Sequence, residues 1–175
     1  MPIKKIISGA QWGSDIGGLE AALYCDIPYG GWIPKGRKAE KGIVPRKYDQ
    51  LREMKSADYL ARTEANVVDS DATLVLTYGE ATGGSKRTIE FAEKHHKPVL
   101  HVAIDQYSPE DAALFVKKWF DGEMTELVPP KECVLNVAGS RESKAPGIQD
   151  KTMAVIIEVI NKVNGVCFYP IRAEG

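Results

Sequence analysis

IISGAQWGSD at residues 6–15 joins an apolar run to a loop with Gly and Ser, and the loop leads into a predicted helix. Two later stretches repeat this order: LVLTYGEATGGS at residues 74–85 and VLNVAGSRES at residues 134–143. Apolar runs without polar alternation are typical of parallel strands that helices cover on both faces. The carboxyl ends of such strands meet at one edge, where open α/β sheets bind ligands. The three stretches therefore predict one binding site at that edge.

The rest of the chain alternates strands and helices. Strands are expected at 3–8, 73–77, 98–102 and 133–138, and helices from Ser14, over 85–96, from Ser108 and over 149–164. Ser108 is a predicted N-cap because Pro109 suits the first helical position. This alternation predicts an α/β fold with a mainly parallel, doubly wound sheet and helices on both faces, in one domain over 1–175.

Composition narrows the class of protein. The 175 residues are 43% hydrophobic and carry a net charge of −1, which gives no reason to expect nucleic-acid binding. No apolar run approaches the length of a membrane span, and the N-terminus does not resemble a signal peptide. The three cysteines, Cys25, Cys133 and Cys167, favour free thiols and a cytoplasmic location. Their spacing, and that of the histidines, supports no metal site.

Residues 30–59 do not follow the strand–helix alternation. They contain eight Lys or Arg and four Asp or Glu, so this segment carries about +4. A loop of this length is usually functional or disordered. Trp32, Ile33 and Tyr48 argue against disorder, and Lys35 and Arg37 are candidates to neutralise an anion. The alternatives are a solvated surface excursion or an oligomer contact.

The three loops offer different groups to a ligand. In the first, Gly9 and Gly13 permit a tight turn, Ser14 or Asp15 can cap the helix, and Gln11 can reach a ligand. In the second, the Thr82-Gly83-Gly84-Ser85 run brings hydroxyls and amides to a helix N-terminus, which favours anions. Their spacings match neither the dinucleotide fingerprint nor the P-loop. The alternative for the first loop is a simple strand–helix turn. For the second loop it is that Lys86 and Arg87 point to solvent, and for the third that Arg141 is a surface arginine paired with Glu142 or another acid.

The third loop adds Gly139, Arg141 and Ser143, and Arg141 can bind an oxyanion through two hydrogen bonds. Arg62, Thr63, Glu64 and Asn66 form a polar cluster on a predicted short helix. They either position a ligand or form an internal salt-bridge network.

Taken together, these motifs resemble the circularly permuted YpsA-like family over residues 5–163. The motifs are ISGAQxGxD at 7–15, GWxPKGR at 31–37, RTExNV at 62–67, TGGS at 82–85 and NVAGxRES at 136–143. The resemblance implies a Rossmann-like fold, molybdenum carriage, and a nucleotide or pterin phosphate as ligand. It also implies kinship with the Lonely Guy phosphoribohydrolases, whose motif is Pro-Gly-Gly-x-Gly-Thr-x-x-Glu. Here the proline and the Gly-Thr pair are absent, and the glutamate has no clear equivalent.

The leading hypothesis is a carrier that binds the molybdenum cofactor, a pterin phosphate or a nucleotide, with no metal ligated by the protein itself. A nucleotide N-glycosidase is the enzymatic alternative, with Glu64, Asp15 and Arg62 as catalytic candidates, and a nucleotide-sensing module is the third. A homo-oligomer is expected. The predicted binding residues are Gly9, Gln11, Gly13, Ser14, Asp15, Lys35, Arg37, Thr82, Gly83, Gly84, Ser85, Gly139, Arg141 and Ser143.

Overall fold

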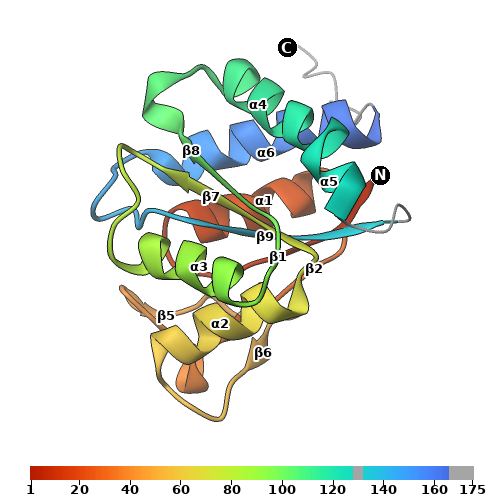
Figure 1. Cartoon of the computed structure of the whole chain (residues 1–175). Coiled ribbons are helices and arrows are strands. Elements are labelled where there is room, and N and C mark those ends of the chain that lie inside the picture. The colour runs from red at the N-terminus through yellow and green to blue at the C-terminus, as the bar shows by residue number, and fades with distance from the viewer. Residues whose placement is uncertain (128–131, 166–175) are drawn as a thin grey trace.

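A five-stranded parallel sheet in the order β2-β1-β9-β7-β8 forms the centre of the protein (Figure 1). The computed structural model describes residues 1–127 and 132–165, so Cys167 lies outside the described residues. The strands are β1 (Ile3–Ile7), β2 (Tyr29–Gly30), β7 (Ala72–Thr77), β8 (Val99–Ala103) and β9 (Cys133–Gly139). Every residue of β7 is buried, as the unbroken apolar run predicts.

Helices cover both faces of this sheet. One face carries α1 (Ser14–Tyr24), α4 (Pro109–Asp121) and α6 (Ile148–Asn164). The other carries α2 (Tyr59–Asp69) and α3 (Gly83–Lys94), as Figure 1 shows. The short α5 (Glu123–Leu127) follows α4, and single 3₁₀ turns occur at Lys35–Arg37 and Ile104–Gln106. The predicted doubly wound α/β fold is thereby confirmed.

Local signals set several helix ends as the sequence indicates. Ser108 caps α4, because its side-chain oxygen accepts a hydrogen bond from the backbone N–H of Asp111 at 3.1 Å. Gly165 ends α6 at a φ of 85°, which favours glycine. The apolar side of α6 packs into the core against α1 and α4. This helix is therefore a core element within the chain.

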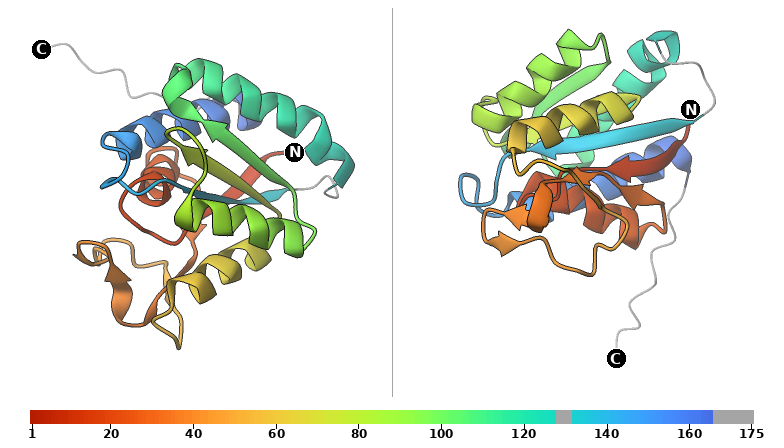
Figure 2. Two further views of the ribbon diagram at one scale, coloured as in Figure 1. Left: turned by 60° about the vertical axis from the view of Figure 1, so that its left-hand side comes forward. Right: turned by 90° about the horizontal axis from the view of Figure 1, so that it is seen from below.

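Residues 30–59 fold into a packed unit on α1. Its strand pairs are β3 (Trp32–Ile33) with β6 (Arg52–Glu53), and β4 (Lys38–Ala39) with β5 (Gly42–Ile43). Ile33 and Tyr48 share a buried cluster with Ile16 and Leu19 of α1. Figure 2 shows this orange segment beside α1 and α2. Of the alternatives for this segment, a fully solvated excursion does not describe it, because its apolar side chains are buried against α1.

The structure also bears on the predictions about membrane spans and cysteines. None of the helices within residues 1–127 and 132–165 is long and apolar enough to cross a membrane. Cys133 is buried in β9 and is a free cysteine within the part of the chain that the structure describes.

Candidate functional site

The loops after β1, β7 and β9 meet at the carboxyl edge of the sheet. Ser14 Oγ donates a hydrogen bond to the carbonyl of Leu76 at 2.9 Å, and the N–H of Ser140 donates to the same oxygen at 3.1 Å. Gly139 permits this approach, since a Cβ there would lie 1.7 Å from the Leu76 oxygen. Gly13 is also confined, since a Cβ there would lie 2.4 Å from the carbonyl oxygen of Ser140. These residues hold the loops together.

A cleft of about 530 Å³ opens beside this junction, between α2, α3 and the loops after β1 and β9. Four cationic and two acidic side chains line it, so its wall carries a surplus of positive charge. The lining residues are Gln11, Asp15, Tyr59, Leu60, Arg62, Thr63, Gly83, Gly84, Lys86, Arg87, Thr88, Glu90, Ala138, Gly139 and Arg141. An adjoining recess of about 140 Å³ shares Gly84, Gly139 and Arg141 with the cleft and adds Tyr78, Glu80, Thr82, Ser85, Ser140 and Lys144.

The N-terminus of α3 faces both hollows. Thr82 occupies its N-cap position without a side-chain hydrogen bond to the helix. A Cβ added to Gly84 would meet no atom within 4 Å, so no neighbouring protein atom requires glycine there. Helix N-termini present unpaired N–H groups and a partial positive charge, which together suit an anion. The open backbone at Gly84 would let an anion approach closely.

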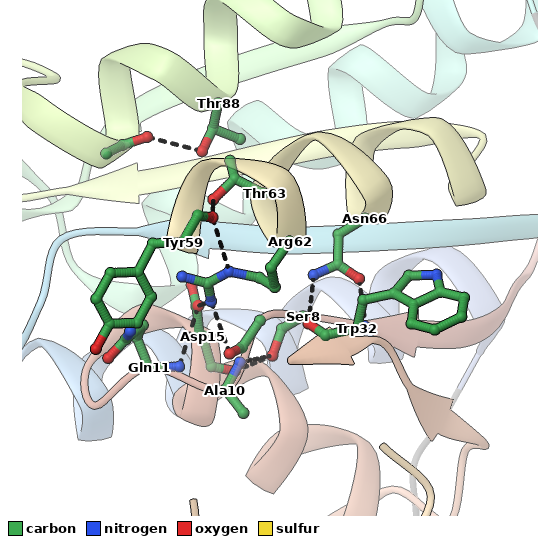
Figure 3. A network of polar contacts seen from close by, with 12 residues as sticks. Ser8, Ala10, Gln11, Asp15, Trp32, Tyr59, Arg62, Thr63, Asn66 and Thr88 are labelled. Atoms are coloured by element: carbon green, nitrogen blue, oxygen red, sulfur yellow. Dashed lines mark hydrogen bonds and ion pairs between the residues drawn. The ribbon is translucent and has the colours of Figure 1, made fainter. Parts of the chain in front are cut away.

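A buried ion pair forms the opposite wall of the cleft. Arg62 Nη1 donates to the carbonyl of Gly9 at 2.7 Å and lies 3.5 Å from Asp15 Oδ2 (Figure 3). Burial raises the pKa of Asp15, although Arg62 and the N–H of Gln11 act to lower it. Burial lowers the pKa of Arg62, although Asp15 acts to raise it. The pair holds α2 against the first loop.

Three cationic side chains lie close to the ring of Tyr59, which lines the cleft. The guanidinium carbons of Arg62 and Arg141 lie 5.5 and 5.3 Å from the centre of its ring, and Lys38 Nζ lies 4.9 Å away. Such contacts are electrostatically favourable. Lys38 thus brings a cation of segment 30–59 to this site.

Gln11 contributes a donor without a partner. Its Oε1 accepts a hydrogen bond from the backbone N–H of Glu40 at 3.2 Å. Its Nε2 is buried and has no partner among the described residues. Leaving such a group unpaired costs about 1–3 kcal/mol, which a bound acceptor would recover.

The structure brings most of the predicted site residues together. The cleft contains Gln11, Asp15, Arg62, Gly83, Gly84, Gly139 and Arg141, and the adjoining recess contains Thr82 and Ser85. Gly9 packs against the Arg62 side chain, while Gly13 and Ser14 hold the loop junction.

Besides Gly9, Gly13 and Ser14, four further predicted residues line neither hollow: Lys35, Arg37, Glu64 and Ser143. The guanidinium of Arg37 donates to the carbonyls of Val44, Pro45 and Tyr48, so it stabilises segment 30–59. Lys35 and Ser143 are exposed away from the lining. Glu64 accepts hydrogen bonds from Lys94 at 2.9 Å and, in the corresponding tautomer, from His95 at 2.7 Å.

Glu90 was missed at the level of sequence, although a signal for it existed. It lines the cleft from α3 and pairs with Arg87 at 2.6 Å. Counted from Gly83-Gly84, it falls where the motif Pro-Gly-Gly-x-Gly-Thr-x-x-Glu has its glutamate. By that count, Glu90 is the equivalent of the motif's glutamate, contrary to the expectation that the chain lacks one. Tyr59 was also missed, because no local pattern marks an aromatic residue that cations from three segments surround.

Comparison with known proteins identifies the family of the chain. A family model described as the circularly permutated YpsA SLOG family matches residues 6–160. The chain belongs to this family. A solved structure of a "putative molybdenum carrier protein" from Syntrophus aciditrophicus SB is 47% identical, with a TM-score of 0.81. The match covers 90% of this chain and 94% of that one. No curated protein sequence matches the chain.

Proposed function

We propose that this member of the circularly permutated YpsA SLOG family is a carrier that binds a phosphorylated small molecule in the cleft beside α3. The observation that carries the proposal is the open, uncapped N-terminus of α3 at Gly84, in a cleft with a surplus of cations. In this arrangement the amides of Gly83 and Gly84 would bind the anion and Arg141 would neutralise it. The name of the Syntrophus aciditrophicus structure supports a molybdenum-bearing cargo.

Molybdenum would enter this cleft as cargo, either as molybdate or on a pterin phosphate. Both are anions whose oxygens suit backbone N–H and guanidinium donors. No cysteine occurs among the described residues that line the cleft. The donor set therefore fits the oxygens and the phosphate of the cargo, and it offers no thiolate to the metal.

Isothermal titration calorimetry with molybdate, inorganic phosphate and inosine monophosphate tests this proposal. Gly84→Asp places a carboxylate where the anion would lie, so we expect affinity to fall by more than about tenfold, equivalent to about 1.4 kcal/mol. Leu114→Asp is the matched control, because it adds the same charge at an exposed position of α4. Equal affinities in both variants, or no binding of any of the three probes to the wild type, would overturn the proposal.

A nucleotide N-glycosidase is a second candidate, favoured by Glu90 and Arg87 on the wall of the cleft. Glu90 would orient water or ribose, and the phosphate would lie at α3. The purified protein is incubated with nucleoside monophosphates, and free base is measured by chromatography. Base release that Glu90→Gln abolishes and Glu64→Gln preserves would establish the hydrolase, because Glu64 lies outside the cleft. If the wild type releases no base, the hydrolase is excluded and the carrier remains the proposed function.

A cytoplasmic location and a homo-oligomer stay predictions from the sequence. Size-exclusion chromatography with light scattering measures the oligomeric state directly.

A further inference from the structure

Gln11 has a fixed orientation on the wall of the cleft. Its Oε1 is occupied by the backbone N–H of Glu40, in the turn between β4 and β5. The side chain is only 6% exposed, and Nε2 is the end left without a partner in the described part of the chain. A carboxamide nitrogen donates hydrogen bonds and does not accept them. Any partner that a ligand supplies to Gln11 must therefore be an acceptor.

The size of the cleft indicates how such a ligand would lie. A volume of about 530 Å³ falls in the range of sites for organic small molecules and exceeds the need of a bare tetrahedral anion. With a phosphate at Gly83 and Gly84, the remaining space extends towards Gln11 and Tyr59, which line the same cleft. Figure 3 shows Gln11, Asp15 and Tyr59 together at this end.

The first loop makes this end of the cleft rigid. Asp15 Oδ2 accepts a hydrogen bond from the Gln11 backbone N–H at 3.2 Å, and Arg62 holds the carbonyl of Gly9. The Gln11 amide is therefore anchored through its backbone and through Oε1. Rotation of the amide to present its oxygen to a ligand would break the bond to Glu40.

We propose that Gln11 is a specificity-determining residue that donates a hydrogen bond from Nε2 to an oxo group on the ring of the ligand. The cleft then prefers phosphorylated ligands whose heterocycle carries an oxo group over those that carry an amino group at the same place. The inference rests on the proposed function, because the phosphate at α3 places the ring. The turn at Glu40 acts as a positioning element, which links segment 30–59 to ligand choice.

Inosine and adenosine monophosphate provide the test, because they carry the same ribose phosphate and differ by an oxo or an amino group on the purine. We expect the wild type to bind inosine monophosphate about tenfold more tightly, the contribution of one good hydrogen bond. In Gln11→Glu the carboxylate cannot donate a hydrogen bond. We therefore expect the affinity for inosine monophosphate to fall more than that for adenosine monophosphate, so that the preference is lost. Gln50→Glu is the charge-matched control, since Gln50 is exposed and lies outside the cleft.

The affinities of the wild type for the two nucleotides test the inference even if Gln11→Glu folds poorly. Equal affinity for the two nucleotides overturns the inference, as does binding of inorganic phosphate without either nucleotide. An equal loss of affinity for both nucleotides in Gln11→Glu also overturns the inference, because such a loss indicates that Gln11 contacts the shared ribose. Failure of phosphate, molybdate and both nucleotides to bind the wild type would instead overturn the proposed function itself.

Discussion

Arg62 Nη1 lies 3.5 Å from Asp15 Oδ2, with only 6% and 12% of the two side chains exposed. The two residues come from different elements, α2 and α1, and both line the cleft. Removing both charges from water is costly, and the loss of one partner leaves the other uncompensated. This contact therefore couples the stability of the fold to the shape of the candidate site.

Arg62→Met should lower the free energy of unfolding by about 3–5 kcal/mol, because Asp15 and the Gly9 carbonyl lose their buried donor. Urea denaturation followed by circular dichroism measures this loss. The double variant Arg62→Met/Asp15→Asn should recover part of it, since the uncompensated carboxylate is gone. Arg87→Met is the control, because the exposed Arg87–Glu90 pair should contribute less than about 1 kcal/mol. Similar losses in Arg62→Met and Arg87→Met would contradict this account.

Much of the fold follows from local sequence. The apolar run of β7 and the N-cap at Ser108 each indicate their element without reference to distant residues. The strand pairing of Trp32–Ile33 with Arg52–Glu53 has no such signal, because two-residue strands show no period. That unit is held by distant contacts, such as Asn66, which donates to the Trp32 carbonyl at 3.0 Å and accepts from its N–H at 2.7 Å.

For the candidate site, too, some residues could be predicted from the sequence and others depend on packing. Gly83, Gly84 and Arg141 could be predicted, because parallel strands bring their loops to one edge. Arg62 and Glu64 belong to one polar cluster in the sequence, yet residues two apart on a helix point about 200° apart. When α2 packs on the sheet, Arg62 is buried at the cleft and Glu64 faces away towards Lys94. Only the packing of α2 decides which of the two serves the site.

Two glycines of the site should respond oppositely to alanine. Gly139→Ala should lower the free energy of unfolding by about 1–3 kcal/mol or more, because its Cβ would overlap the Leu76 carbonyl at a φ of 154°. Gly84→Ala should raise it by up to about 1 kcal/mol, since the Cβ meets no atom and alanine favours a helix. Urea denaturation of both variants measures the contrast. A destabilised Gly84→Ala protein would show that Gly84 has a structural role.

Cys133 should be inert towards alkylation in the folded protein. Burial raises the pKa of its thiol to about 12, and Asp71 adds to this effect. Because the thiolate is the reactive form, iodoacetamide at pH 8 should leave Cys133 unmodified in the native protein. The same treatment in guanidinium chloride should modify it fully, as peptide mass spectrometry would show. Equal rates in the two conditions would mean that β9 opens readily.

Glu20 should make the attachment of segment 30–59 to α1 sensitive to acid. Its carboxylate accepts hydrogen bonds from Lys47 at 2.7 Å and from the Tyr48 hydroxyl. Burial acts to raise the pKa of Glu20, but these two hydrogen bonds outweigh it, so the pKa lies below its usual value. The folded state therefore favours the charged form. The resulting stabilisation is present above about pH 4.3, the value of an unperturbed glutamate, and is lost as the pH falls through the lowered pKa.

Glu20→Gln should accordingly be less stable than the wild type at pH 7, and the difference should shrink as the pH falls below about 4. Urea denaturation at a series of pH values measures this difference directly. Glu93→Gln, at an exposed position of α3, is the control and should show no comparable trend. Comparison with the wild type at each pH isolates the contribution of Glu20. A difference that stays constant down to pH 3 would show that the charge of Glu20 does not stabilise the contact with Lys47 and Tyr48.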